Sequence, residues 1–178
     1  IPVLTQHVHD WLARWASYTP EKLFLREHTS DRSWTYGQFN EVSRRCARFL
    51  QQEMKLSKGD RLAIYSRNRM EYFMLYFAAI KLGVIVVPLN FRLTSVELDV
   101  LLKDAEPQAM VFEEAYSEQV ELLRSLGKNC QKISVESLSS LLAVDKNAAE
   151  IEFLNTETDP EDLVMILYTS GTTGVPKG

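Results

Sequence analysis

The stretch that decides the fold is YFMLYFAAIKLGVIVVPL, residues Tyr72–Leu89, in which Lys81 is the one charged side chain. Its length approaches that of a membrane span. Gly83 divides it, however, because good helix formers precede this glycine and the β-branched run Val84–Val87 follows it. Glycine is also favoured immediately after the end of a helix. The stretch therefore predicts a buried helix followed by a buried parallel strand, and not one spanning helix.

Similar strand and helix units surround this stretch. Predicted strands are the short apolar runs RLAIYS (61–66), VIVVPLN (84–90), AMVFE (109–113) and the weaker KISVE (132–136). Predicted helices run from a cap at Asn68 and Glu71 to Leu82, from a cap at Thr94 and Glu97 to Ala105, and from about Tyr116 to Leu126. Strands that alternate with helices in this way predict an α/β fold with a mostly parallel, doubly wound sheet flanked by helices. Such sheets bind ligands at the carboxyl ends of their strands.

The first third of the chain predicts a helix, a hairpin and a second helix. The first helix is expected over Val8–Ser17, and the hairpin strands over Leu23–Arg26 and Ser33–Thr35. Thr35 followed by Gln38 has the spacing of a capping box, so the second helix should begin there.

The last part of the chain combines an acidic stretch, an apolar run and a loop. Residues 143–162 are polar and acidic, and we interpret them as a solvated connection. A buried strand, LVMILY (163–168), is predicted next and leads directly into YTSGTTGVPKG, residues 168–178. Glycines let a ligand approach the backbone, whose N–H groups can form an anion-binding nest. The hydroxyl side chains and Lys177 add further donors, so the loop suits a polyphosphate.

This loop is not a Walker A motif. Counted from Gly171, the second glycine of that motif would fall at Pro176, and Lys177 is followed by Gly178 instead of a hydroxyl residue. Pro176 also favours an extended conformation at Val175, so phosphates would be held without a helix dipole behind them. A flexible linker would explain the composition alone, but a linker does not normally follow a buried strand without a break.

The terminal stretch resembles, at all eleven positions, the signature phosphate loop of the adenylate-forming superfamily, which includes acyl-CoA synthetases, luciferases and adenylation domains of peptide synthetases. Three upstream stretches are also similar to that family, so the resemblance covers nearly the whole chain: WTYGQFNEVSRRCARFL (34–50), AAIKLGVIVVPLNFRLTSVEL (78–98) and LKDAEPQAMVFE (102–113). The version PLNFRLTSVEL (88–98) is most similar to fatty-acyl-CoA ligases.

The resemblance implies an AMP-forming acid–thiol ligase. Such an enzyme joins a carboxylic acid to AMP from Mg-ATP, releases pyrophosphate, and passes the acyl group to coenzyme A. The implied cofactors are ATP, Mg²⁺ and coenzyme A, of which the last two have no identifiable ligands in this chain. The resemblance assigns the ATP phosphates to Thr169, Ser170, Gly171, Thr172, Thr173, Gly174 and Lys177. It identifies no catalytic residue and no metal ligand here.

The resemblance also implies a domain organisation. Residues 1–178 would form the N-terminal part of the AMP-binding large domain and end in the phosphate loop 168–178. The small C-terminal domain with its catalytic lysine would lie downstream, so this fragment alone should be inactive.

Two other functions stay open at this point. One is an adenylation domain that loads a carrier protein, and the other is a non-catalytic nucleotide-binding or interaction fragment. The net charge of −4 over 178 residues argues against nonspecific nucleic-acid binding, which needs a basic face. No integral membrane segment or signal peptide is predicted, so a cytoplasmic protein is expected. Peripheral association with membranes, a homo-oligomeric state and the length of the acyl substrate stay open.

Overall fold

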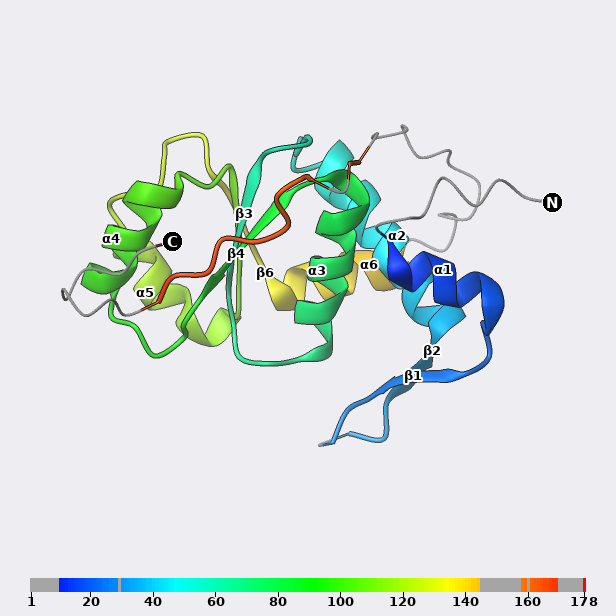
Figure 1. Cartoon of the computed structure of the whole chain (residues 1–178). Helices are drawn as coiled ribbons and strands as arrows, with labels where there is room; N and C mark the ends of the chain where they lie inside the picture. Colours follow the sequence, from blue (N-terminus) through cyan, green and yellow to red (C-terminus); the bar gives the residue numbers. More distant parts are fainter. Residues whose placement is uncertain (1–9, 29, 145–157, 160, 170–177) are drawn as a thin grey trace.

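The computed structural model describes residues 10–28, 30–144, 158–159, 161–169 and 178 (Figure 1). Its centre is a four-stranded sheet in the order β4–β3–β5–β6. The strands are β3 (Arg61–Tyr65), β4 (Ile85–Leu89), β5 (Ala109–Phe112) and β6 (Gln131–Ser134). Every neighbouring pair in this sheet is parallel. The predicted α/β fold with a parallel sheet is confirmed.

Helices pack on both faces of the sheet. One face is covered by α2 (Tyr36–Gln52), α3 (Met70–Leu82) and α6 (Val135–Val144), and the other by α4 (Ser95–Ala105), η2 (Glu114–Tyr116) and α5 (Ser117–Glu121). Successive side chains of a strand point to opposite faces. In β3, Leu62 and Ile64 therefore join the first core cluster, whereas Ala63 and Tyr65 join the second. The sheet is doubly wound, as predicted.

The N-terminal elements pack outside these layers, next to α2 (Figure 1). They are α1 (Trp11–Tyr18) and the antiparallel hairpin strands β1 (Leu23–Arg26) and β2 (Ser33–Thr35). The rings of Phe24, Phe39 and Phe77 contact one another at centroid distances of 5.0–6.1 Å and join the hairpin to α2 and α3. The capping box at Thr35 and Gln38 is present, so the predicted start of α2 is confirmed.

The stretch Tyr72–Leu89 has the predicted division at Gly83. This residue has a φ of 67°, and its N–H donates to the last carbonyl groups of α3. That left-handed conformation favours glycine because a Cβ would crowd the backbone. Strand β4 begins two residues later. None of the helices within the described residues is long and apolar enough to span a bilayer.

Lys81, the charged side chain within this apolar stretch, is buried. Its Nζ donates to a carboxylate oxygen of Asp10 and to Asn40 Oδ1, the latter at 2.7 Å. The Lys81 side chain is 6% exposed and that of Asp10 is 14% exposed. Asp10 also caps α1, since its Oδ1 accepts from Ala13 N at 3.0 Å. One carboxylate thus ties the start of α1 to α3.

Two predicted helix boundaries are wrong. Helix α3 begins at Met70 after Arg69, which makes no side-chain capping bond, so Asn68 is not its cap. Helix α5 ends at Glu121 and not at Leu126, because Asp99 Oδ1 accepts from the backbone N–H groups of Arg124 and Ser125, each at 2.8 Å. These bonds hold the chain in a turn.

The predicted strand 132–136 also ends early. Strand β6 stops at Ser134, and α6, which no sequence pattern predicted, starts at Val135. The Ser134 hydroxyl accepts from Ser137 N at 3.1 Å, which is the bond that a helix-capping serine makes. A local serine cap therefore overrides the strand tendency of the β-branched residue Val135, whereas Ile133 stays in the strand.

Candidate functional site

The segment 163–168, predicted as a buried strand, lies beside β4. Val86 N donates to Val164 O, and Ile166 N donates to Val86 O, both at 2.9 Å. This single parallel bridge does not extend into a strand. Leu163 is 65% exposed and Leu167 is 60% exposed. The prediction of a buried strand is therefore wrong for these residues, which among the described parts of the chain have β4 as their sheet neighbour on one side.

The first residue of the predicted phosphate site follows this segment. Parallel alignment with β4 makes the segment run toward the edge of the sheet where the strands end. Thr169 comes next and is exposed. The other predicted site residues lie outside the described part of the chain: Ser170, Gly171, Thr172, Thr173, Gly174 and Lys177. Their role in phosphate binding stays a prediction.

The side chain of Tyr168 connects the segment to α4. Its hydroxyl donates to Asp104 Oδ2 at 2.7 Å, and Asp104 lies in the last turn of that helix. Burial, and then the hydrogen bond to Asp104, raise the pKa of Tyr168, so the phenol keeps its proton at neutral pH. Both residues lie in stretches that carry the family resemblance, but they are 64 positions apart. Sequence reasoning missed this contact because nothing local indicates it.

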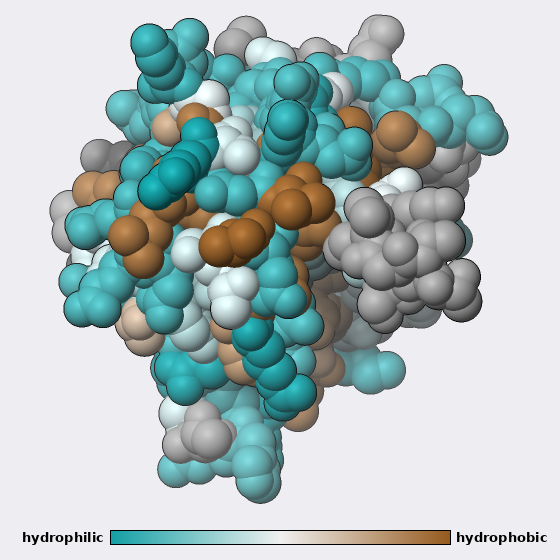
Figure 2. All heavy atoms as spheres, turned by 90° about the vertical axis from the view of Figure 1, so that its left-hand side faces the viewer, coloured by the Kyte–Doolittle hydropathy of each residue, from teal (hydrophilic) through white to brown (hydrophobic). Residues whose placement is uncertain are grey.

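Apolar side chains are exposed on the side of the molecule that carries α4 and α5 (Figure 2). Val96 of α4 is 75% exposed, and Leu122, just after α5, is 64% exposed.

A groove of about 560 Å³ lies between the end of α4 and the segment 163–168, and Arg61, Asp104 and Tyr168 line it.

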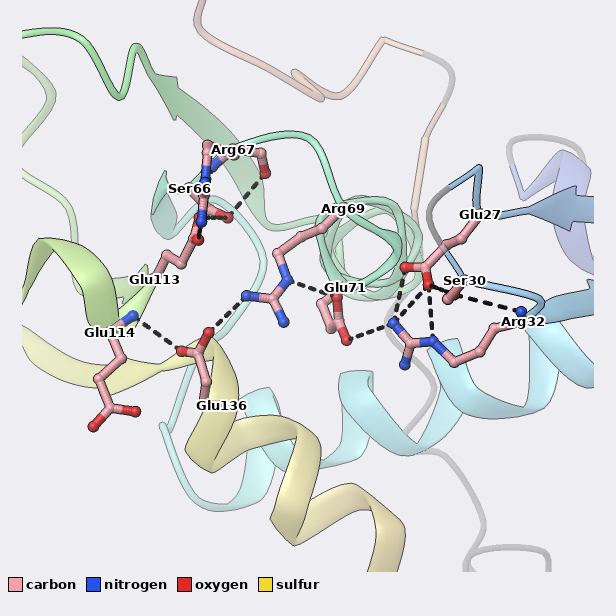
Figure 3. A network of polar contacts seen from close by, with 10 residues as sticks. All are labelled: Glu27, Ser30, Arg32, Ser66, Arg67, Arg69, Glu71, Glu113, Glu114 and Glu136. Atoms are coloured by element: carbon pink, nitrogen blue, oxygen red, sulfur yellow. Dashed lines mark hydrogen bonds and ion pairs between the residues drawn. The ribbon is translucent and has the colours of Figure 1, made fainter.

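The carboxyl end of the sheet carries a network of ion pairs (Figure 3). Chain order reverses between β3 and β5, which is the place where doubly wound sheets form ligand crevices. Here Arg67, which follows β3, donates through Nε to Glu113 Oε1 at 3.0 Å, and Glu113 follows β5. Backbone N–H of Arg67 donates to the same carboxylate at 3.1 Å. Glu113 is 5% exposed, whereas the Arg67 side chain is 60% exposed, so the pair joins a buried carboxylate to a guanidinium at the surface.

The same network extends toward the hairpin. Arg69 Nε donates to Glu71 at 2.8 Å, and its Nη1 donates to Glu136 of α6 at 2.7 Å. Arg32 of the hairpin lies 3.8 Å from the other oxygen of Glu71. Glu71 is 3% exposed, so the two arginines compensate a buried charge. The network joins strands, helices and hairpin, and we assign it a structural role.

Replacing Glu113 with Gln tests that role. The hydrogen bond from Arg67 holds the pKa of Glu113 below its usual value. A carboxylate with a lowered pKa stabilises the fold above its unfolded pKa, and this contribution is lost as the pH falls through the folded pKa. Glu113→Gln should therefore lower the free energy of unfolding by about 1 kcal/mol at pH 7. Denaturant unfolding from pH 7 to pH 3 should show this difference shrinking with acidity; a constant difference would contradict the assignment.

No metal site is found within the described ranges. They contain no group of three or more His, Cys, Asp or Glu side chains that could hold an ion. Cys46 is buried and its burial raises the pKa of its thiol. The described residues therefore give no fit for Mg²⁺.

A doubly wound parallel sheet binds nucleotides at the carboxyl ends of its strands in many α/β domains, and the glycine- and hydroxyl-rich sequence 168–178 follows a segment that runs toward that edge. The chain belongs to the AMP-binding enzyme family, whose model matches residues 12–178. A curated relative is the long-chain-fatty-acid–CoA ligase FadD13 of Mycobacterium tuberculosis, which is 31% identical over 173 residues. The match covers 94% of this chain and 33% of the relative, so the chain spans about a third of the relative's length.

Solved structures agree with this assignment. The inhibitor-bound N-terminal domain of FACL13 from Mycobacterium tuberculosis has a TM-score of 0.83 and is 31% identical to this chain. The match covers 95% of this chain and 42% of the solved one. O-succinylbenzoate coenzyme A synthetase (MenE) from Bacillus subtilis, in complex with ATP and magnesium ion, has a TM-score of 0.75 and 30% identity. That match covers 94% of this chain and 41% of the other.

Proposed function

We propose that this chain is the N-terminal part of the large domain of an ATP-dependent acyl-CoA synthetase. The observation that carries the proposal is the stretch 168–178, within a family match that extends over residues 12–178. The similarity to a long-chain-fatty-acid–CoA ligase favours a fatty acid as the carboxylate substrate. The similarity to a structure with bound ATP and magnesium favours ATP as the nucleotide.

In this proposal the loop that begins at Thr169 holds the β- and γ-phosphates. The substrate carboxylate attacks the α-phosphorus, and pyrophosphate leaves. The barrier comes mainly from charge repulsion and from the need to align the reacting groups, so the protein contributes by neutralising and orienting the phosphates. Hydroxyl groups of Thr169, Ser170, Thr172 and Thr173 would donate to phosphate oxygens, and Lys177 would supply a positive charge.

The proposed domain organisation explains the exposed apolar surface. Leu163 and Leu167 are more than half exposed on a segment that pairs with β4, and Val96 at the start of α4 is 75% exposed. The remainder of a larger domain would pack there and supply the acyl pocket, the metal ligands and the catalytic lysine. The chain alone is therefore expected to be inactive. The expected location is the cytoplasm, with coenzyme A as the thiol acceptor.

Carboxylate-dependent exchange between ATP and labelled pyrophosphate tests the proposal on the full-length protein. Short, long and aromatic acids should be compared, and the long-chain acids should support the fastest exchange. Coenzyme A or an acyl carrier protein is then added to identify the acceptor. Only with the true acceptor should a thioester form and AMP be released from the acyl-adenylate. Absence of exchange with every acid would rule out the synthetase and favour a non-catalytic nucleotide-binding fragment.

A further inference from the structure

The last backbone contacts before the predicted phosphate loop are few. Segment 163–168 is held to the sheet by the two bonds between Val86 and its partners Val164 and Ile166. Leu167 is 60% exposed and contributes little packing. Side-chain contacts of the segment therefore matter for the direction in which the chain continues at Thr169.

The Tyr168 side chain supplies such a contact. Together with Ile166, its ring packs against the core cluster on the α4 side of the sheet. Its hydroxyl donates to Asp104 Oδ2 at 2.7 Å. Because a tyrosine side chain has only two main torsions, a ring held at both ends leaves its own backbone little freedom. Tyr168 is also the residue directly before Thr169, the first predicted phosphate ligand.

The acceptor is part of a fixed helix end. Helix α4 is anchored in the core by Leu98, Leu101 and Leu102, which are at most 3% exposed. Its final carbonyl groups are bound by Arg61, which donates to Ala105 O at 2.9 Å and to Glu106 O at 2.8 Å. Asp104 therefore offers its carboxylate from a rigid position.

The other end of the loop returns to the same ring. A Cβ placed on Gly178 would lie 2.7 Å from Tyr168 Cε1 and 2.8 Å from Ile166 Cγ2. Real Cβ atoms do not approach so closely, so the Gly178 backbone is in tight contact with these two side chains. Tyr168 and Gly178, the residues on either side of the stretch 169–177, are thus in contact with each other.

We propose that Tyr168 and Asp104 form a positioning pair, which fixes Tyr168 and Gly178, the residues on either side of 169–177, next to α4 and thereby supports binding of the ATP tail. This inference rests on the proposed function. The pair touches no substrate, so it should act on the use of MgATP and not on recognition of the acid. When the two ends of the loop are already fixed, phosphate binding costs less conformational entropy. The affinity for MgATP should therefore be higher with the pair intact.

Kinetics of the full-length protein test the pair. Tyr168→Phe removes one hydroxyl, and Asp104→Ala removes its acceptor; each should raise the KM for MgATP about fivefold, as expected for one lost hydrogen bond. The KM for the acid should be unchanged. The double variant should be no worse than either single variant, because the two residues contribute one interaction. Asp104→Asn keeps an acceptor oxygen and should stay within about twofold of the unchanged protein.

A matched control is Tyr18→Phe, which removes a hydroxyl from a half-exposed tyrosine of α1 and should leave every constant unchanged. Amide hydrogen exchange gives a readout that does not need activity: peptides covering residues 169–178 should exchange about fivefold faster in Tyr168→Phe than in the unchanged protein. Equal exchange rates, or an unchanged KM for MgATP in an active protein, would overturn the pair. If the unchanged protein did not catalyse pyrophosphate exchange, the proposed function would be overturned. Amide hydrogen exchange would still decide whether the positioning pair of Tyr168 and Asp104 exists.

Discussion

Replacing both Thr172 and Thr173 with Ala in the full-length protein is expected to lower kcat/KM for MgATP by about 10-fold or more. The physical reason is the loss of two hydroxyl donors to phosphate oxygens, since a hydrogen bond to a charged group is worth roughly 1.5 kcal/mol or more. Initial rates of pyrophosphate exchange at varied MgATP give this ratio directly. The KM for the carboxylic acid should change little, because the two hydroxyls are proposed to contact only the nucleotide.

A matched control for this double variant is Thr19→Ala. Thr19 follows α1, and its hydroxyl makes only a long bond of 3.4 Å to Trp15 O. It should leave nucleotide kinetics unchanged. Unchanged kinetics in the Thr172 and Thr173 variant as well would mean that the phosphates do not lie where we propose.

The second large effect is expected at Asp10. Asp10→Ala removes the carboxylate that pairs with buried Lys81 and also the cap of α1. Leaving a buried charge without its partner costs about 3 kcal/mol or more. Amide hydrogens of α1 should therefore exchange about 100-fold faster in the full-length protein, since each tenfold corresponds to about 1.4 kcal/mol. Mass spectrometry of peptides from residues 11–18 measures this change.

Two companion variants separate the ion pair from the cap. Asp10→Asn keeps a capping oxygen and should show an intermediate effect. The double variant Asp10→Asn/Lys81→Met removes both charges, keeps the capping oxygen and puts an apolar side chain of similar length in place of the lysine. Burial lowers the pKa of Lys81, so its charge is held at a cost, and the double variant, which leaves neither charge unpaired, should change stability by less than about 1 kcal/mol. If the double variant were as harmful as Asp10→Ala, the ion pair could not be explained in this way.

The sequence predicted most of the fold because its strongest signals are local. The change at Gly83 from helix formers to β-branched residues, and the capping boxes at Thr35 and Thr94, each depend on residues within a few positions of one another. The predictions that were wrong depend on distant partners. Helix α5 is shortened by Asp99, which lies more than twenty residues earlier. The segment 163–168 is exposed because burial of a strand requires neighbours that its own residues cannot reveal.

The candidate site shows the same limit. The sequence 168–178 could be assigned to a family because its signal lies in consecutive residues. The match over residues 12–178 confirms that the chain belongs to that family. The contact between Tyr168 and Asp104 joins two regions through a single side-chain bond, and no periodicity or spacing indicates it. The pairing of Arg67 with Glu113 likewise depends on two strands being neighbours in the sheet. Composition and pattern identify the elements, whereas the contacts between them require the folded structure.

The single bridge between segment 163–168 and β4 has a practical consequence for laboratory work on this protein. Since Val164 and Ile166 use their polar backbone groups toward Val86, the backbone of Met165 and Leu167 faces the opposite direction, flanked by apolar side chains. An open edge of this kind is a template for strands of other molecules and a known cause of aggregation. A version of the protein that leaves this edge uncovered should therefore precipitate or form oligomers during purification.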